Sequence, residues 1–174
     1  MGQEFQNELT ASIKDFRLPR YNDIPNVGLF LEQSTKYISD FLEPLPGISI
    51  TSSMISNYVK KKLVSNPVKK QYDRDQIACL IFIAIAKSVL SLENVQVLMR
   101  LQKNACSSQK AYDYFCRLFE GYLFYVFGLR ETIEEVSETG SEEQIILRNT
   151  VIAIVHKIYL EISIHLLDEM LESK

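Results

Sequence analysis

The sequence has few of the residues from which metal, disulfide and nucleotide sites are built. Among 174 residues it contains no tryptophan, two histidines, three cysteines and six glycines. The cysteines, Cys79, Cys106 and Cys116, are odd in number and lack zinc-type spacing, so we expect free thiols in a reducing cytoplasm. The glycines stand singly, which excludes a Walker or dinucleotide-binding loop.

Candidates for catalysis are equally sparse. His156 and His165 are nine residues apart on one predicted helix, where about 100° per residue places them on opposite faces, unable to share a metal ion. A nucleophile pair of Cys116 with either histidine is geometrically conceivable and otherwise unsupported. The acidic pairs Glu134–Glu135 and Glu142–Glu143 are better explained as solvated carboxylates. We therefore expect no enzyme activity, no metal and no cofactor.

No apolar run is long enough to cross a membrane. The longest, Ile77–Ala86, has ten residues, whereas a membrane-spanning helix needs roughly 20. No signal-peptide pattern opens the chain, and so we expect a cytoplasmic protein with no membrane partner. With 47% hydrophobic and 24% charged residues, the chain suits one substantial domain or two small ones packed together.

Helical periodicity is present in almost every segment. It predicts helices over residues 3–16, 27–42, 51–64, 74–90, 109–127 and 142–171, and Ser91 can cap one more. The aromatic helix over 109–127 is either core or the lining of an effector pocket. The last helix carries two apolar stripes, and the aromatic helix can cover one and another subunit the second. One stripe is formed by Leu147, Val151, Ile154 and Ile158, and the other by Ile152, Val155, Tyr159, Ile162 and Leu166.

Positive charge is concentrated in one segment although the net charge of the chain is −3. Residues 51–76 carry two anions, Asp73 and Asp75, and six cations: Lys60, Lys61, Lys62, Lys69, Lys70 and Arg74. The rest of the chain has 13 cations and 20 anions. Such a local excess steers an anionic partner to one patch, although a solvated charged face has the same composition.

The predicted helix at the start of this segment has two different faces. Ile55, Tyr58 and Leu63 recur at helical spacing on the core side, and Thr51 stands where an N-cap belongs. The other side carries Ser53, Ser56, Asn57, Lys60 and Lys61. A polar and cationic helix followed by a basic, proline-broken segment is typical of a recognition helix and wing.

The order of elements from Ile50 to Leu101 resembles the DNA-binding half of MerR-like transcriptional regulators. The corresponding pieces are Ser52–Tyr58, Leu63–Pro67, Lys69–Tyr72, Asp75–Leu80 and Ser91–Val95. More narrowly, the segments 18–21 and 52–61 look like an uncharacterised bacterial family thought to contain such regulators. The resemblance implies that Tyr58 and Tyr72 lie near the sugar-phosphate backbone, although a core or hinge position is also open for both.

Three departures from that family bear on how DNA is contacted. Ser56 and Asn57 replace an Arg and a Tyr that usually touch phosphates, and Lys62 replaces a Gly that closes the helix. Lys62 is expected to be strained if it adopts the left-handed conformation. A proline-rich link also replaces the tight turn before the recognition helix.

We therefore predict a mainly α protein that is a DNA-binding homodimer and a transcriptional regulator. An N-terminal arm (1–20) precedes a winged helix-turn-helix domain (21–105) with a short wing and a helical C-terminal region (106–174) for dimerisation or sensing. The residues expected at double-stranded DNA are Ser53, Ser56, Asn57, Tyr58, Lys60, Lys61, Lys62, Lys69, Lys70, Tyr72 and Arg74. The alternatives are a protein–protein adaptor built on the same scaffold, and a sensor of an unknown small-molecule effector.

Overall fold

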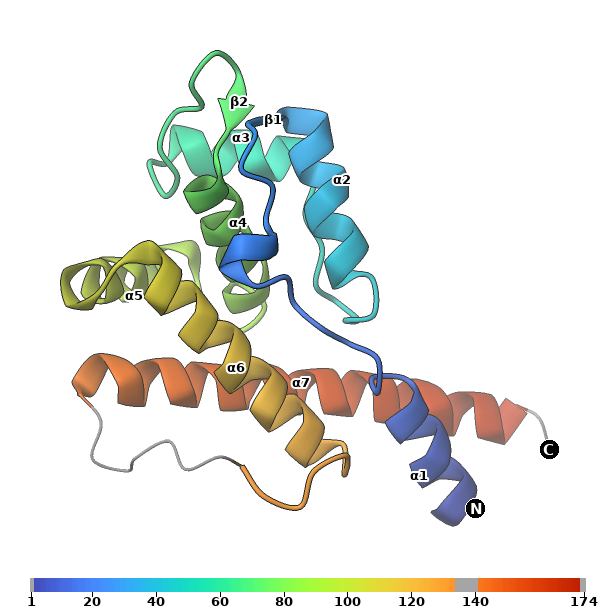
Figure 1. Cartoon of the computed structure of the whole chain (residues 1–174). Coiled ribbons are helices and arrows are strands. Elements are labelled where there is room, and N and C mark those ends of the chain that lie inside the picture. The colour runs from blue at the N-terminus through green and yellow to red at the C-terminus, as the bar shows by residue number, and fades with distance from the viewer. Residues whose placement is uncertain (1, 134–140, 173–174) are drawn as a thin grey trace.

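A computed structural model describes residues 2–133 and 141–172 of the chain. As the periodicity predicts, the described part is mainly helical, with two short strands (Figure 1). The strands are β1, Leu29–Phe30, and β2, Gln71–Tyr72, and a 3-10 turn, η1, spans Tyr21–Asp23. The helices are α1 (Gly2–Ala11), α2 (Leu31–Leu42), α3 (Ser52–Lys60), α4 (Arg74–Ala86), α5 (Leu92–Ala105), α6 (Ser108–Val126) and α7 (Glu142–Glu172).

Helix α4 is the central, buried helix of the fold, as its continuous apolar sequence predicts. Ten of its 13 residues are buried, and it packs against α2, α5, α6 and α7. Asp73 and Gln76 form a reciprocal capping box at its start: the Asp73 carboxylate accepts from the Gln76 N–H at 2.8 Å, and the Gln76 amide oxygen accepts from the Asp73 N–H at 2.9 Å. A single continuous core surrounds α4.

The segment before α2 is a strand, where the helical pattern predicts a helix from Val27. Leu29 pairs with Tyr72 and Phe30 with Gln71 in an antiparallel ladder, so tertiary pairing overrides the local propensity. Gly28 permits this approach, because a Cβ at that position would lie 2.7 Å from the Cβ of Gln71. Helix α2 therefore begins only at Leu31.

The opposite side of the molecule is a base formed by α7, with α6 crossing it and α1 packed near its far end (Figure 1). The predicted stripe of Leu147, Val151, Ile154 and Ile158 is fully buried. The docking of α1, which the sequence leaves open between this chain and a partner, is on this chain: Leu9 is buried, and Thr10 donates to the Phe127 carbonyl at 3.2 Å.

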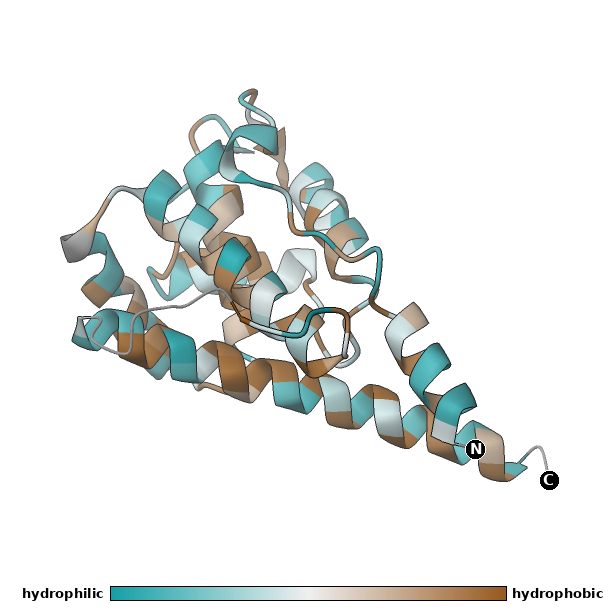
Figure 2. Ribbon diagram, turned by 60° about the horizontal axis from the view of Figure 1, so that its bottom comes forward, coloured by the Kyte–Doolittle hydropathy of each residue, from teal (hydrophilic) through white to brown (hydrophobic). Residues whose placement is uncertain are grey.

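The second predicted stripe of α7 is covered by this chain itself and not by a second subunit. Its members are buried or half-buried within this chain, because α7 packs against four other helices. Exposed apolar residues lie at two places on α7: Ile145 and Ile146 near its start, and Leu160, Ile164, Leu167 and Leu171, which are 57%, 65%, 39% and 67% exposed, in its second half (Figure 2 shows apolar residues recurring along α7).

One described helix, α7, is long and apolar enough to cross a membrane by length and composition. The most apolar part of this helix includes core positions, since Val151, Ile154, Val155 and Ile158 are at most 1% exposed. Packing of α6 and α1 explains part of its apolar character, because only 33% of its apolar 18-residue window is buried within this chain.

The chain between α1 and η1 is fastened to α6 by a buried carboxylate. Glu120 accepts from the Leu18 backbone N–H at 2.9 Å and from both terminal nitrogens of Arg20 at 2.9 and 2.7 Å. A bidentate guanidinium–carboxylate pair of this kind is geometrically specific. Together with the Tyr21 N–H, which donates to Asp113 at 2.8 Å, it fixes where the polypeptide enters the α2–β1 region.

Candidate nucleic-acid interface

Helix α3 has the two faces that its sequence predicts. Thr51 is its N-cap and accepts from the Met54 N–H at 3.2 Å. Ile55 and Tyr58 are buried, whereas Ser53, Ser56, Asn57 and Lys60 are exposed. The Ser52 hydroxyl, held by Glu32 at 3.0 Å and Thr35 at 2.9 Å, ties the start of α3 to α2. The polar face is therefore presented outward on a helix anchored at its N-terminus.

The end of α3 is closed by a lysine in the left-handed conformation. Lys62 has φ of 60°, and its N–H donates to the Val59 carbonyl at 2.9 Å while Leu63 N–H donates to Tyr58 at 2.9 Å. These two bonds form a Schellman motif, in which glycine is the usual residue at the left-handed position. The strain predicted for Lys62 is thus present, at a cost of about 1 kcal/mol relative to glycine.

The segment after α3 forms a tight hairpin whose turn consists of two lysines. Val68 and Gln71 exchange backbone hydrogen bonds of 3.1 and 2.9 Å around Lys69 and Lys70. Lys69 and Lys70 have φ of 51° and 64°, the pattern of a type I′ turn, where Asn and Gly are favoured. Both lysines are exposed, so two cations project from the strained turn of the hairpin.

Figure 1 places α3, the turn after it and this hairpin at one end of the molecule, away from α7. We call this end the tip and define it by Ser53, Ser56, Asn57, Lys60, Lys61, Lys62, Lys69 and Lys70. All eight of these predicted site residues are exposed. None of the five lysines forms an ion pair with any residue in the described ranges.

Three other residues expected at DNA do not lie on this surface. Tyr58 and Tyr72 are 2% and 4% exposed, so their side chains belong to the core, and burial raises the pKa of both hydroxyls. Arg74 is half-buried: its Nε donates to the Ile24 carbonyl at 2.8 Å and its guanidinium lies 5.5 Å from the centre of the Tyr21 ring. These residues shape the tip from beneath instead of presenting groups to a phosphate.

The fold adds two cations that sequence reasoning missed. Arg100 and Lys103 of α5 line one pocket together with Lys60 and Lys62, although some 40 residues separate them in the chain. The two α5 residues are exposed and share one helix face, since they are three positions apart. That spacing was the only signal in the sequence, and it does not reveal which element the face meets.

The other chemistry weighed from the sequence finds little geometric support. No group of three or more metal-binding side chains occurs among the residues that the structure describes. Cys116 is buried, and desolvation raises the pKa of its thiol to about 12, so it is held protonated and poorly nucleophilic. Glu142 and Glu143 open α7, where a helix N-terminus favours carboxylates; the Ser141 hydroxyl, first, and the backbone lower the pKa of Glu143. Glu134–Glu135 lies outside the described residues.

Comparison with known proteins gives a family but no described activity. No curated protein matches the chain, and no solved structure matches it. A family model described as a domain of unknown function (DUF1836) matches residues 19–115, which contain β1, β2, α2 to α5 and the whole of the tip. Because this match covers more than half of the chain, the protein belongs to the DUF1836 family.

Proposed function

We propose that this protein is a cytoplasmic, sequence-specific DNA-binding protein that acts as a dimeric transcriptional regulator. The observation that carries the proposal is the tip, where the polar face of α3 stands beside a hairpin with two lysines at its turn. The major groove of DNA admits an α-helix. Serine, asparagine and lysine side chains on such a helix bind base edges or lie beside them. Exposed lysines beside such a helix are suited to phosphates.

The topology supports a winged helix-turn-helix arrangement for residues 21–105. Strand β1 precedes α2 and α3, and it pairs with β2, which is the second arm of the hairpin after α3. This order places a small sheet and its hairpin beside the second helix of the pair, as a wing stands beside a recognition helix. In this proposal the short hairpin around Lys69 and Lys70 is the wing.

We assign base contacts to α3 and phosphate contacts to the turns. Asn57 is exposed on α3 and is the best candidate for a base edge, since an asparagine amide can bond an adenine bidentately. Ser56 donates to the Ser52 carbonyl at 2.9 Å, and so its hydroxyl reaches DNA mainly as an acceptor. Lys62, Lys69 and Lys70 are placed on phosphates, and the buried Tyr58 and Tyr72 are left out of the contact set.

The test is binding of the full chain to genomic DNA fragments over a range of salt concentrations. Replacing Lys69 and Lys70 with alanine is expected to weaken binding to all sequences and to flatten the salt slope by roughly one unit per lost phosphate contact. The matched control replaces Lys36 and Lys14, exposed lysines outside the tip, and is expected to leave the slope unchanged. An unchanged slope in the wing variant would contradict the assignment of the wing.

We further propose that α7 pairs two copies of the chain. Leu160, Ile164, Leu167 and Leu171 follow the four–three–four spacing of a coiled-coil seam, which a second helix with the same repeat fits best. Glu161, Asp168, Glu169 and Glu172 surround this seam, so an anionic membrane surface is a poor occupant. Two paired copies would present two tips and would set the spacing of two DNA half-sites.

Sedimentation of wild type and of a variant with Ile164→Asp and Leu167→Asp tests this pairing. The variant is expected to be monomeric, while a control with Ala153→Asp and His156→Asp, both exposed on the same helix, is expected to remain a dimer. Wild-type protein that stays monomeric at micromolar concentration would overturn the pairing without affecting the DNA assignment.

A second candidate is a protein–protein adaptor that uses the tip for an acidic partner. Residues 43–51 between α2 and α3 form a longer link than the three- or four-residue turn of a DNA-binding helix pair, which favours this alternative. Pull-down from lysate with and without nuclease separates the two. A protein partner that survives nuclease treatment, with no DNA recovered, would favour the adaptor.

A further inference from the structure

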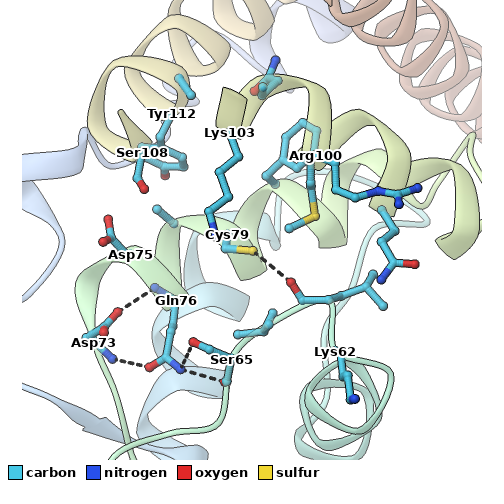
Figure 3. Close-up of a pocket in the computed structure, with 18 of the residues that line it drawn as sticks. Lys62, Ser65, Asp73, Asp75, Gln76, Cys79, Arg100, Lys103, Ser108 and Tyr112 are labelled. Carbon is cyan, nitrogen blue, oxygen red and sulfur yellow. Dashed lines mark hydrogen bonds between the residues drawn. The ribbon is translucent and has the colours of Figure 1, made fainter. Parts of the chain in front are cut away.

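A pocket of about 980 Å³ opens directly beside the tip, between the turn after α3, the helices α4 and α5, and the start of α6 (Figure 3). A cavity of this size is within the range that accepts a small molecule. Its apolar lining comes from four separate elements and includes Leu63, Phe82, Met99 and Phe115. The pocket is therefore formed by the tertiary fold and does not belong to any single helix.

The carboxylates and the cations around this pocket differ in whether they already have a partner within the protein. The two carboxylates are engaged: Asp73 caps α4, and Asp75 accepts from the Tyr21 hydroxyl at 2.6 Å. Lys60, Lys62, Arg100 and Lys103 line the same pocket, and none of them forms an ion pair within the described ranges. In Figure 3 Lys103 extends into the pocket beside Cys79. The unengaged charge of the pocket is thus positive.

Two of the polar side chains that line the pocket, Gln76 and Cys79, are already engaged within the protein. Gln76 donates to the Ser65 carbonyl and hydroxyl at 2.8 and 3.1 Å, and its amide oxygen is held by the Asp73 N–H. The Cys79 thiol points to the Leu63 carbonyl at 3.9 Å, and desolvation raises the pKa of this thiol to about 12, so it carries no charge. A ligand is therefore recognised by contact with the apolar side chains of the lining and by its cations.

We infer that this pocket binds an amphipathic organic anion, with an aromatic or alkyl body in the apolar interior and its acidic group at Arg100 and Lys103. A guanidinium or ammonium pairs with a carboxylate, sulfonate or phosphate through charge-assisted hydrogen bonds. A neutral ligand leaves these cations without a partner, and a cationic ligand is repelled by them.

Binding at this pocket is coupled to the tip through shared residues, and this step depends on the proposed DNA-binding function. Lys60 and Lys62 belong both to the pocket lining and to the surface assigned to DNA. The segment 62–66, which lines the pocket, also connects α3 to the hairpin. A bound anion reduces the positive charge that these two lysines offer to phosphates, and so the ligand lowers DNA affinity.

The test uses anilinonaphthalene sulfonate as the probe and phenylnaphthylamine, the same rings without the sulfonate, as its neutral counterpart. Fluorescence titration of the full chain is expected to give saturable, one-to-one binding of the sulfonate, with at least a roughly tenfold weaker affinity for the neutral compound. Equal affinity for the two compounds would overturn the role of the cations.

Three variants locate the probe. Replacing Arg100 and Lys103 with glutamine is expected to weaken sulfonate binding roughly tenfold, since both side chains are exposed and the fold does not depend on them. Replacing Lys110 and Arg117, exposed cations of α6 outside the pocket lining, is the matched control and is expected to have no effect. Ala111→Trp, which fills the pocket from α6, is expected to weaken both compounds. An unchanged affinity in the first or the third variant would exclude this pocket.

The coupling is measured by DNA titration with and without saturating probe. DNA affinity is expected to fall in wild type and to respond much less in the Arg100→Gln, Lys103→Gln variant. If DNA affinity does not change when the probe is bound, the coupling is wrong. If the protein binds no DNA even without the probe, the proposed function fails, whereas the probe titration still decides the pocket.

Discussion

At the tip and at the base of this protein, different residue types occupy the backbone positions that have positive φ. Five described residues have positive φ: Gly128, which ends α6, Gly47, which lies in the α2–α3 link against Glu161 of α7, and three lysines at the tip. Gly128 closes α6 in the way that Lys62 closes α3. At the base the strain is avoided by glycine, whereas at the tip it is accepted.

The difference teaches that the tip lysines are not explained by folding. A left-handed lysine costs about 1 kcal/mol relative to glycine and gains no ion pair with a described residue here. Strain that the fold does not require is characteristic of functional sites. Glu120 of α6, by contrast, is engaged, because it binds the Arg20 guanidinium and the Leu18 backbone N–H.

The largest expected effect comes from breaking that engaged pair. Glu120→Ala removes the acceptor of three hydrogen bonds and leaves the Leu18 N–H buried without a partner, so we expect a loss of about 3 kcal/mol in the free energy of unfolding. Urea denaturation measures it. Asp40→Ala, which breaks the exposed Lys36–Asp40 pair, is the control and is expected to cost less than about 0.5 kcal/mol. Similar costs for the two variants would contradict the structural role of Glu120.

Alkaline pH probes the buried frame without a mutation. Burial raises the pKa of the Cys79 and Cys116 thiols from 9.0 to about 12, so the folded state keeps protons that the unfolded chain releases. The unfolding free energy is therefore expected to fall as pH rises from 9 toward 12, by up to about 1.4 kcal/mol per pH unit for each thiol. Denaturation at several pH values measures the slope. Cys79→Ala and Cys116→Ala should each flatten it, and replacement of the exposed Cys106 should not.

Giving the hairpin the residues that its turn prefers should separate stability from binding. Lys69→Asn with Lys70→Gly relieves two positive-φ positions, so we expect the protein to gain about 1 to 2 kcal/mol in unfolding free energy and to lose DNA affinity. The alanine pair loses the same charges but keeps the strain, and so it should lose affinity without the gain in stability. Equal stability of the two variants would show that the turn is unstrained.

The sequence was sufficient where a pattern is local and insufficient where a partner is distant. The caps at Thr51 and Ser91 and the buried stripe of α7 follow from spacing alone, and all are confirmed. Strand β1 could not be predicted, because its pairing partner lies 40 residues further along the chain. The exposed seam of α7 was missed for the same physical reason: which apolar face stays uncovered depends on where α1 and α6 pack.

The residues of the candidate site also divide into those that local spacing predicts and those whose position depends on distant parts of the chain. Exposure of the serine, asparagine and lysine face follows from helical periodicity, because its apolar counterpart had to face a core. The burial of Tyr72 and the pairing of Arg74 with the Ile24 carbonyl depend on the strand and the link that pack over them. Arg100 and Lys103 line one pocket with Lys60 and Lys62 only because of the tertiary fold, which no spacing within either helix encodes.

The smallest expected effect concerns Tyr58, which lies on the core side of α3 beneath the tip. Its hydroxyl is buried and has no hydrogen-bond partner in the described structure, and an unsatisfied buried hydroxyl costs about 1 kcal/mol. Tyr58→Phe should therefore leave stability unchanged or raise it by up to about 1 kcal/mol, and DNA affinity and its salt slope should not move. A fall in affinity with an intact fold would mean that the hydroxyl swings out to a phosphate, as the regulator resemblance implies. The Tyr58 hydroxyl would then join the three tip lysines as a group that lowers the stability of the fold and serves DNA binding.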